Sequence, residues 1–128
     1  MAPQSKHVDI LAVADQQAAR TSAEFDSSLH RGIILRVKVG AAAAGAPTYT
    51  PRLEIKLLGA PDWKAIWTAA AAQAVSTDLL YAIGADAVDA GGFQETVAVP
   101  IGPRMRVVIA GGDAGNHADT QAEAVLTI

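Results

Sequence analysis

Apolar and polar residues alternate along much of this chain, which is the pattern of half-buried β-strands. In Ile33–Val39, every second residue from Ile33 onward is apolar, while Arg36 and Lys38 take the opposite parity. The stretch Arg52–Leu58 repeats the rule and turns the charged residues, Glu54 among them, toward solvent. Each stretch is therefore predicted to be a strand with one buried face and one wet face.

Seven further segments of similar length are bounded by Gly, Pro, Asp or Asn, the residues that favour turns. Many short strands with turn residues between them are typical of antiparallel sandwiches and barrels. The predicted fold is therefore all-β, an antiparallel sandwich or barrel of about eight strands. The further strands are predicted at Val8–Ala14, Ala19–Phe25, Trp63–Thr68, Leu79–Ile83, Glu95–Ile101, Arg104–Ala110 and Ala122–Ile128.

The segment Gly40–Pro51 is rich in small residues and is predicted to be a long hairpin loop. A hairpin there would place Arg36 opposite Glu54 on neighbouring strands. Four consecutive alanines at 69–72 have high helix propensity. We therefore expect that the all-β fold has room for one short helix near 68–75, with a weaker candidate near 14–21.

The length of 128 residues indicates one domain. We divide it into an N-terminal arm or extra strand, 1–18, and a β-sandwich domain, 19–128. An arm could add a strand to a neighbouring molecule. In that case Val8 and Ile10 are its candidate contact residues.

The amino-acid composition limits the classes of function that this chain can have. The chain has 28 alanines and is 51% hydrophobic but only 5% aromatic, so much of its core must be built from small side chains. It has no cysteine, which excludes disulfide scaffolds and thiolate metal sites. A net charge of −3 argues against a nucleic-acid partner, and the absence of a long apolar run argues against a membrane partner.

Charge is also unevenly distributed along the chain. Residues 1–64 carry eight basic and six acidic residues, whereas residues 65–128 carry two basic and seven acidic ones. This asymmetry suggests solvated strand faces or a molecule whose two surfaces meet different neighbours.

No pattern of catalytic residues is present. The three histidines, His7, His30 and His117, are far apart and lack metal-ligand spacing. There is no nucleophile elbow, phosphate-binding loop or dinucleotide fingerprint. We therefore expect a protein that is not an enzyme, with no catalytic residues, metal or cofactor.

Two groups of residues are candidates for an interface. Trp63 and Trp67 are predicted to share one strand face, where they would anchor the core or a subunit contact. Alternatively, the two rings would form a platform for a carbohydrate. The second group is a predicted basic face made of Arg36, Lys38, Arg52 and Lys56.

The order of short motifs resembles that of a family of small virion proteins of tailed bacteriophages. Members commonly read Arg-Gly plus an apolar strand, a loop, an alternating strand ending in Gly, a turn with an aromatic residue, and a Leu-Pro-Arg-x-Trp-Arg-Val strand. Here these elements are Arg31–Val39, Leu53–Gly59, Trp63–Trp67 and Ile101–Val107. The last one departs from the pattern, since Met105 stands at the usual aromatic position. The resemblance covers residues 19–128.

This resemblance implies a capsid decoration, or cement, protein with a β-sandwich or jelly-roll fold. Such a protein would bind the major capsid protein on the outer capsid surface and stabilise the shell. It would be assembled in the host cytoplasm as a homo-oligomer. A trimer is the first choice for its oligomeric state, and a dimer is the second. The alternatives are a virion protein of the tail, neck or head-fibre base, and, from another class, a carbohydrate-binding β-sandwich.

Overall fold

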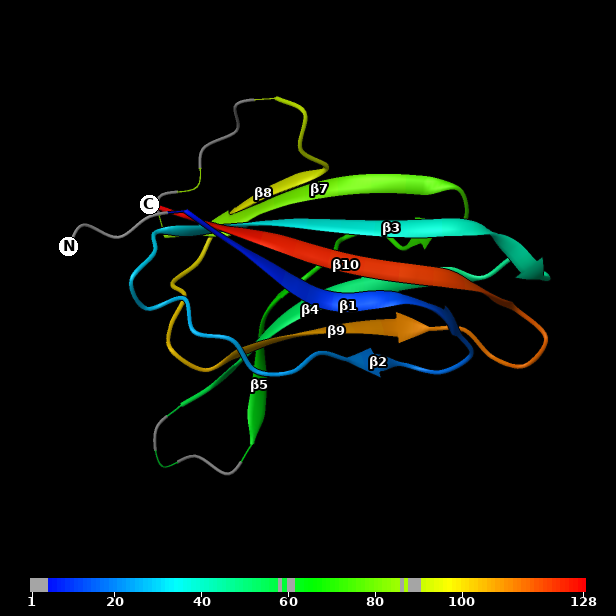
Figure 1. The fold of residues 1–128 in the computed structure, drawn as a ribbon, viewed down its shortest axis with the longest axis horizontal. Helices are drawn as coiled ribbons and strands as arrows, with labels where there is room; N and C mark the ends of the chain where they lie inside the picture. Colours follow the sequence, from blue (N-terminus) through cyan, green and yellow to red (C-terminus); the bar gives the residue numbers. More distant parts are fainter. Residues whose placement is uncertain (1–4, 58, 60–61, 86, 88–90) are drawn as a thin grey trace.

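The computed structural model describes residues 5–57, 59, 62–85, 87 and 91–128, and in these residues it contains strands and no helix. No described segment is therefore a helix that could cross a bilayer. The strands, shown in Figure 1, are β1 (Lys6–Gln16), β2 (Arg20–Thr21), β3 (Gly32–Ala44), β4 (Thr48–Lys56), β5 (Trp63–Thr68), β6 (Gln73–Ala74), β7 (Thr77–Gly84), β8 (Glu95–Ala98), β9 (Met105–Gly111) and β10 (His117–Thr127).

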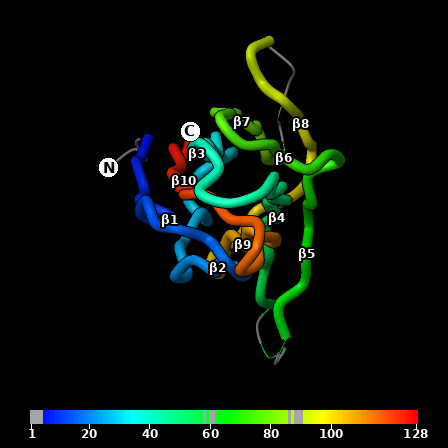
Figure 2. The backbone as a smooth tube through the Cα atoms, turned by 90° about the vertical axis from the view of Figure 1, so that its right-hand side faces the viewer, coloured from blue at the N-terminus to red at the C-terminus, as the bar shows by residue number. Residues whose placement is uncertain are grey.

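The strands form two sheets packed face to face. Sheet A has the order β1-β10-β3-β7-β8, and sheet B has the order β2-β9-β4-β5, with β6 paired to β4. The end-on view in Figure 2 shows the two layers. Strand pairing is antiparallel throughout except between β7 and β8, which run parallel.

The main strands are paired in a nested order: β1 with β10, β2 with β9, β3 with β7, and β4 with β5. The chain is thus one long hairpin that has been rolled up. Rolling brings β10 against β3 and β9 against β4, which completes the two sheets. This is the jelly-roll arrangement, and the predicted all-β antiparallel sandwich is confirmed.

The predicted inward positions do fill the core. Ile33, Leu35, Val37 and Val39 are at most 1% exposed on β3, and Met105, Val107 and Ile109 on β9 are fully buried. Alanine supplies much of the inner surface of β10, where residues 118, 122 and 124 are buried. Small side chains on one sheet leave space for large ones on the other. The buried Tyr49 ring of sheet B occupies such a position, since its hydroxyl reaches the backbone of Ala118.

A buried polar cluster joins the two sheets beside β1. The Gln16 Nε2 group donates to the Ile109 carbonyl of sheet B at 2.7 Å, and Gln16 Oε1 accepts from the Thr120 hydroxyl at 2.7 Å. The Tyr49 hydroxyl donates to the Gln16 carbonyl and accepts from the Ala118 N–H, both at 2.9 Å. Gln16, Tyr49 and Thr120 are each at most 1% exposed, so these bonds satisfy groups that water cannot reach.

The short helix predicted near 68–75 is absent, and this prediction is wrong. The Ala69 N–H donates to the Pro51 carbonyl at 3.0 Å, and β6 pairs with β4. Gln73 is 2% exposed, donates to the Val37 carbonyl of sheet A at 2.7 Å, and accepts from the Tyr81 hydroxyl at 3.3 Å. These tertiary bonds override the helix propensity of the alanines.

The weaker helix predicted near 14–21 is absent as well. Its residues complete β1, make a short connection and enter β2. The buried Gln16 explains the outcome, because its side chain reaches both sheets only from the end of an extended strand.

The predicted hairpin between 33–39 and 52–58 is also wrong. β3 continues to Ala44, so the alanine run 41–44 is strand and not loop, and β4 begins at Thr48 in the other sheet. The connection is therefore short and passes between sheets. Gly45 makes it possible, because its φ is +63° and a Cβ there would lie 2.2 Å from Asn116 Oδ1. Of the predicted strand, residue 58 lies outside the described residues.

Within the predicted arm or extra strand, 1–18, residues 6–16 form β1 at the edge of sheet A. Ile10 belongs to the core cluster, and Val8 packs against it. Two register shifts interrupt the pairing of β1 with β10, a feature that protects exposed sheet edges. Residues 1–4 lie outside the described residues.

Replacing Gln16 with Met keeps the side-chain volume but removes the hydrogen bonds to Ile109 and Thr120. We expect the free energy of unfolding to fall by about 2–4 kcal/mol, because buried polar groups lose their partners. Urea denaturation measures this change. The matched control is Gln17→Met at the exposed neighbouring position, which should change stability by less than about 0.5 kcal/mol. Equal effects of the two substitutions would show that the polar cluster is not a stabilising link.

Candidate interaction surfaces

The outer face of sheet A carries apolar side chains at positions that alternation assigns to solvent. Strand register places Val125 of β10 directly beside Ile34 of β3, and Ile34 directly beside Ala82 of β7. The next row runs from Glu123 through Arg36 to Leu80. Val125 and Leu80 are 36% and 37% exposed. Ala82 is only 9% exposed, so the exposed apolar surface comes from Val125, Ile34 and Leu80 on three adjacent strands.

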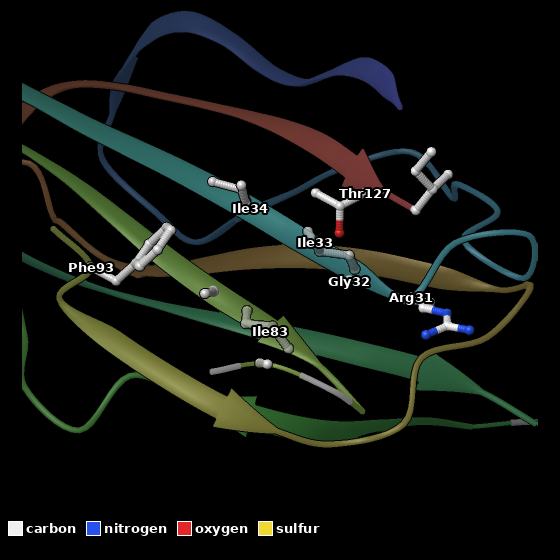
Figure 3. A pocket seen from close by; sticks show the side chains of 10 residues that line it. Arg31, Gly32, Ile33, Ile34, Ile83, Phe93 and Thr127 are labelled. Carbon is white, nitrogen blue, oxygen red and sulfur yellow. The ribbon is translucent and has the colours of Figure 1, made fainter. Parts of the chain in front are cut away.

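A groove of about 330 Å³ hollows this surface near the start of β3 and the ends of β7 and β10. Figure 3 shows Ile34, Phe93 and Thr127 lining it from three separate parts of the chain. Ile128, which is 62% exposed, also lines the groove. We define the sheet A patch as Ile34, Leu80, Phe93, Val125 and Ile128.

Ion pairs border the sheet A patch. The Arg36 guanidinium donates two hydrogen bonds to the Asp78 carboxylate, at 2.8 and 2.6 Å, and one to Glu123 at 2.7 Å. These hydrogen bonds raise the pKa of Arg36, and the bonds to Asp78 make the largest contribution. Hydrogen bonding to Arg36 in turn holds the pKa of both carboxyls below the ordinary values. An apolar centre with a polar rim is the usual anatomy of a protein interface.

The predicted basic face does not exist as one surface. Arg36 and Lys38 lie on the outer face of sheet A, and Arg52 and Lys56 belong to β4 of sheet B. The prediction fails because β3 and β4 are consecutive in the chain but lie in opposite sheets. The four residues are thus divided between two surfaces.

Trp63 and Trp67 do not share a face. Along β5, Trp67 pairs with Leu53, while Ala65 pairs with Glu54, so Ile66 is an extra residue that reverses the side-chain parity. Trp67 is 6% exposed, its ring centre lies 4.9 Å from that of Tyr81, and its Nε1–H donates to Glu95 at 3.2 Å. Trp67 is a core residue, and the two rings form no common carbohydrate platform.

Trp63 belongs to a polar cluster on the outer face of sheet B. The Arg106 guanidinium carbon lies 4.3 Å from the Trp63 ring centre, a cation–π distance. Arg106 and Arg52 each donate to Glu54 at 2.7 Å. Glu54 is only 6% exposed. Burial by itself raises the pKa of Glu54, but the hydrogen bonds from Arg52 and Arg106 outweigh it and lower the pKa below its ordinary value.

The two predicted interface residues on β1, Val8 and Ile10, have little exposed surface. Ile10 is 7% exposed within the core, and Val8 is half-buried against it. Of the predicted interface residues, Arg36 is the one that borders the apolar surface. The alternation pattern did not predict the sheet A patch. One residue pointed to it: Ile34 is apolar although it stands in the same alternating set as Arg36 and Lys38, which face solvent.

In comparisons with known proteins, no family model, no curated protein and no solved structure matches the chain.

The Glu54 cluster leads to a titration prediction. A carbon-13 NMR titration of Glu54 should give a midpoint below the ordinary glutamate value of about 4.3. The Arg106→Met substitution should raise this midpoint, because one of the two hydrogen bonds that favour the carboxylate is lost. Since the folded-state pKa is the lower one, the stabilisation is full above the ordinary value and is lost as pH falls through the folded-state pKa.

The control for this titration is Arg104→Met, which removes a neighbouring arginine whose partner is Glu24. It should leave the Glu54 midpoint unchanged. An equal rise in both variants would mean that general surface charge, and not the Arg106 hydrogen bond, sets the Glu54 pKa.

Proposed function

We propose that this chain is a structural protein of a tailed-bacteriophage virion that decorates the outer surface of the capsid shell. The proposal draws on the order of motifs from Arg31 to Val107 and on the jelly-roll sandwich. The sheet A patch is the observation that carries it, because it offers an apolar centre and an ion-paired rim on a rigid sheet. A surface of this kind suits binding to another protein.

The partner in this proposal is the major capsid protein. A decoration protein that spans the junction between capsid subunits binds the assembled shell and not the separated subunits. Binding to one state stabilises that state by mass action. The shell would thus gain stability without any chemical step by the decoration protein.

A symmetric homo-oligomer fits this role, with a trimer at capsid three-fold positions as the first choice and a dimer at two-fold positions as the second. Each copy would present its own sheet A patch to the shell, and linked copies would bind more tightly than one copy alone. Assembly in the host cytoplasm, a reducing compartment, suits a chain without cysteine.

The direct test is co-sedimentation with capsids of the encoding phage from which this protein is missing. The wild-type chain should sediment with the capsids, and Val125→Lys should bind at least about tenfold more weakly, since it places a charge within the sheet A patch directly beside Ile34. Val125 is 36% exposed, so circular dichroism should show an intact fold.

The matched control is Leu57→Lys, which changes an exposed leucine outside the patch. It should bind as the wild type does. If the wild-type chain does not bind, the decoration role is contradicted. If all three proteins bind equally, the decoration role stands but the sheet A patch is not the docking surface.

A further inference from the structure

Beside the sheet A patch, three metal-ligating side chains meet on the outer face of β1 and β10. His7 and Asp9 are two residues apart on β1 and so point to the same side of the strand. Asp9 lies directly opposite Glu123 in the strand register. His7 Nε2 is 3.1 Å from Glu123 Oε2 and 3.9 Å from Asp9 Oδ1. All three ligand atoms lie within 4.8 Å of one another.

We propose that His7, Asp9 and Glu123 bind a divalent transition-metal ion of the zinc type. Imidazole and carboxylate ligands at about 2.0–2.2 Å in tetrahedral geometry stand about 3.4 Å apart. The two separations from His7 Nε2, 3.1 and 3.9 Å, lie on either side of this value. The imidazole nitrogen favours zinc-like ions over calcium or magnesium, which prefer oxygen ligands alone. Water would take the fourth position on this exposed surface.

A second set of contacts orients the Glu123 ligand. Arg36 donates to Glu123 Oε1 at 2.7 Å, which leaves Oε2 directed at His7. Arg36 is itself held by Asp78. Outer-shell hydrogen bonds of this kind fix the orientation of ligating carboxylates in metal sites. Glu123 is therefore already positioned as a ligand through one of its oxygens.

Electrostatics favour a cation at the same place. Glu123 and Asp78 both bond to the Arg36 guanidinium, and Lys38 lies close enough to act on Asp78. The Asp9 carboxylate beside Glu123 is a third negative charge, so these carboxylates outnumber the two cations. Like charges directly opposite each other, as Asp9 and Glu123 are, destabilise a strand pair. A bound ion would remove this repulsion and fasten the edge strand β1 to β10. Metal binding should therefore stabilise the fold, and this inference does not depend on the virion role.

The chain provides a matched control on the same two strands. His117 and Asp119 are two apart on β10, and Asp119 lies opposite Asp15 on β1. His117 Nδ1 contacts Asp15 at 2.7 Å. In the part of the chain that the structure describes, however, only the His7 group brings three such ligand atoms within 4.8 Å of one another. A substitution of His117 therefore serves as the control, because it changes a histidine–aspartate pair that lacks a third ligand.

The test is calorimetric titration of the full chain with zinc chloride, together with thermal denaturation. Wild-type protein should bind one zinc ion per chain and melt at a higher temperature with zinc. His7→Gln should weaken binding at least about tenfold, and His117→Gln should bind as the wild type does. Calcium chloride at the same concentrations should produce neither effect.

Nitrogen-15 NMR of the histidine rings provides a readout that does not depend on variants. Zinc should shift the Nε2 resonance of His7 and leave those of His30 and His117 in place. The proposal is overturned if zinc gives no binding, if His7→Gln binds as tightly as the wild type, or if the shifts fall on the other histidines.

Discussion

The buried hydrogen bonds between the two sheets are the constraint on which this structure depends. The inner face of β10 is largely alanine, so on this strand bulky side chains contribute little to holding the two layers in register. Gln16 connects the layers beside β1, and Gln73 connects them beside β3 and β7. Arg20 adds a further link from β2, because its guanidinium donates to the carbonyls of Ala12 and Thr120 at 2.7 and 2.8 Å. Satisfied polar groups of this kind specify one arrangement of a core.

The outer surfaces follow from this arrangement. Because the core takes the inward parity of each strand, only the outward positions are available to a partner. The rolled hairpin places β10 beside β3, and this neighbourhood creates the row of Val125, Ile34 and Ala82. Arg36 lies between the two candidate sites, since it borders the sheet A patch and also holds Glu123 in place beside His7. The fold thus sets both surfaces through the same strand pairs.

Local sequence patterns predicted the strands well. β5 has the predicted bounds, Trp63 to Thr68, although its predicted alternation is broken at Ile66, and the inward parity of 33–39 is correct. The predicted patterns failed where an outcome depends on distant residues. Arg36 is bonded to Asp78 and Glu123, which are 42 and 87 positions away, and alternation carries no information about such partners. The extra residue Ile66 on β5 and the strand at Gln73 were likewise set by tertiary pairing.

The central claim, that this protein decorates a capsid through sheet A, is tested most directly by cryo-electron microscopy of particles that carry it. We expect density for the jelly-roll sandwich on the outside of the capsid, with the sheet A patch facing the shell and sheet B facing away. Density confined to the tail or neck would contradict the decoration role. Density on the capsid with sheet B against the shell would contradict the docking surface.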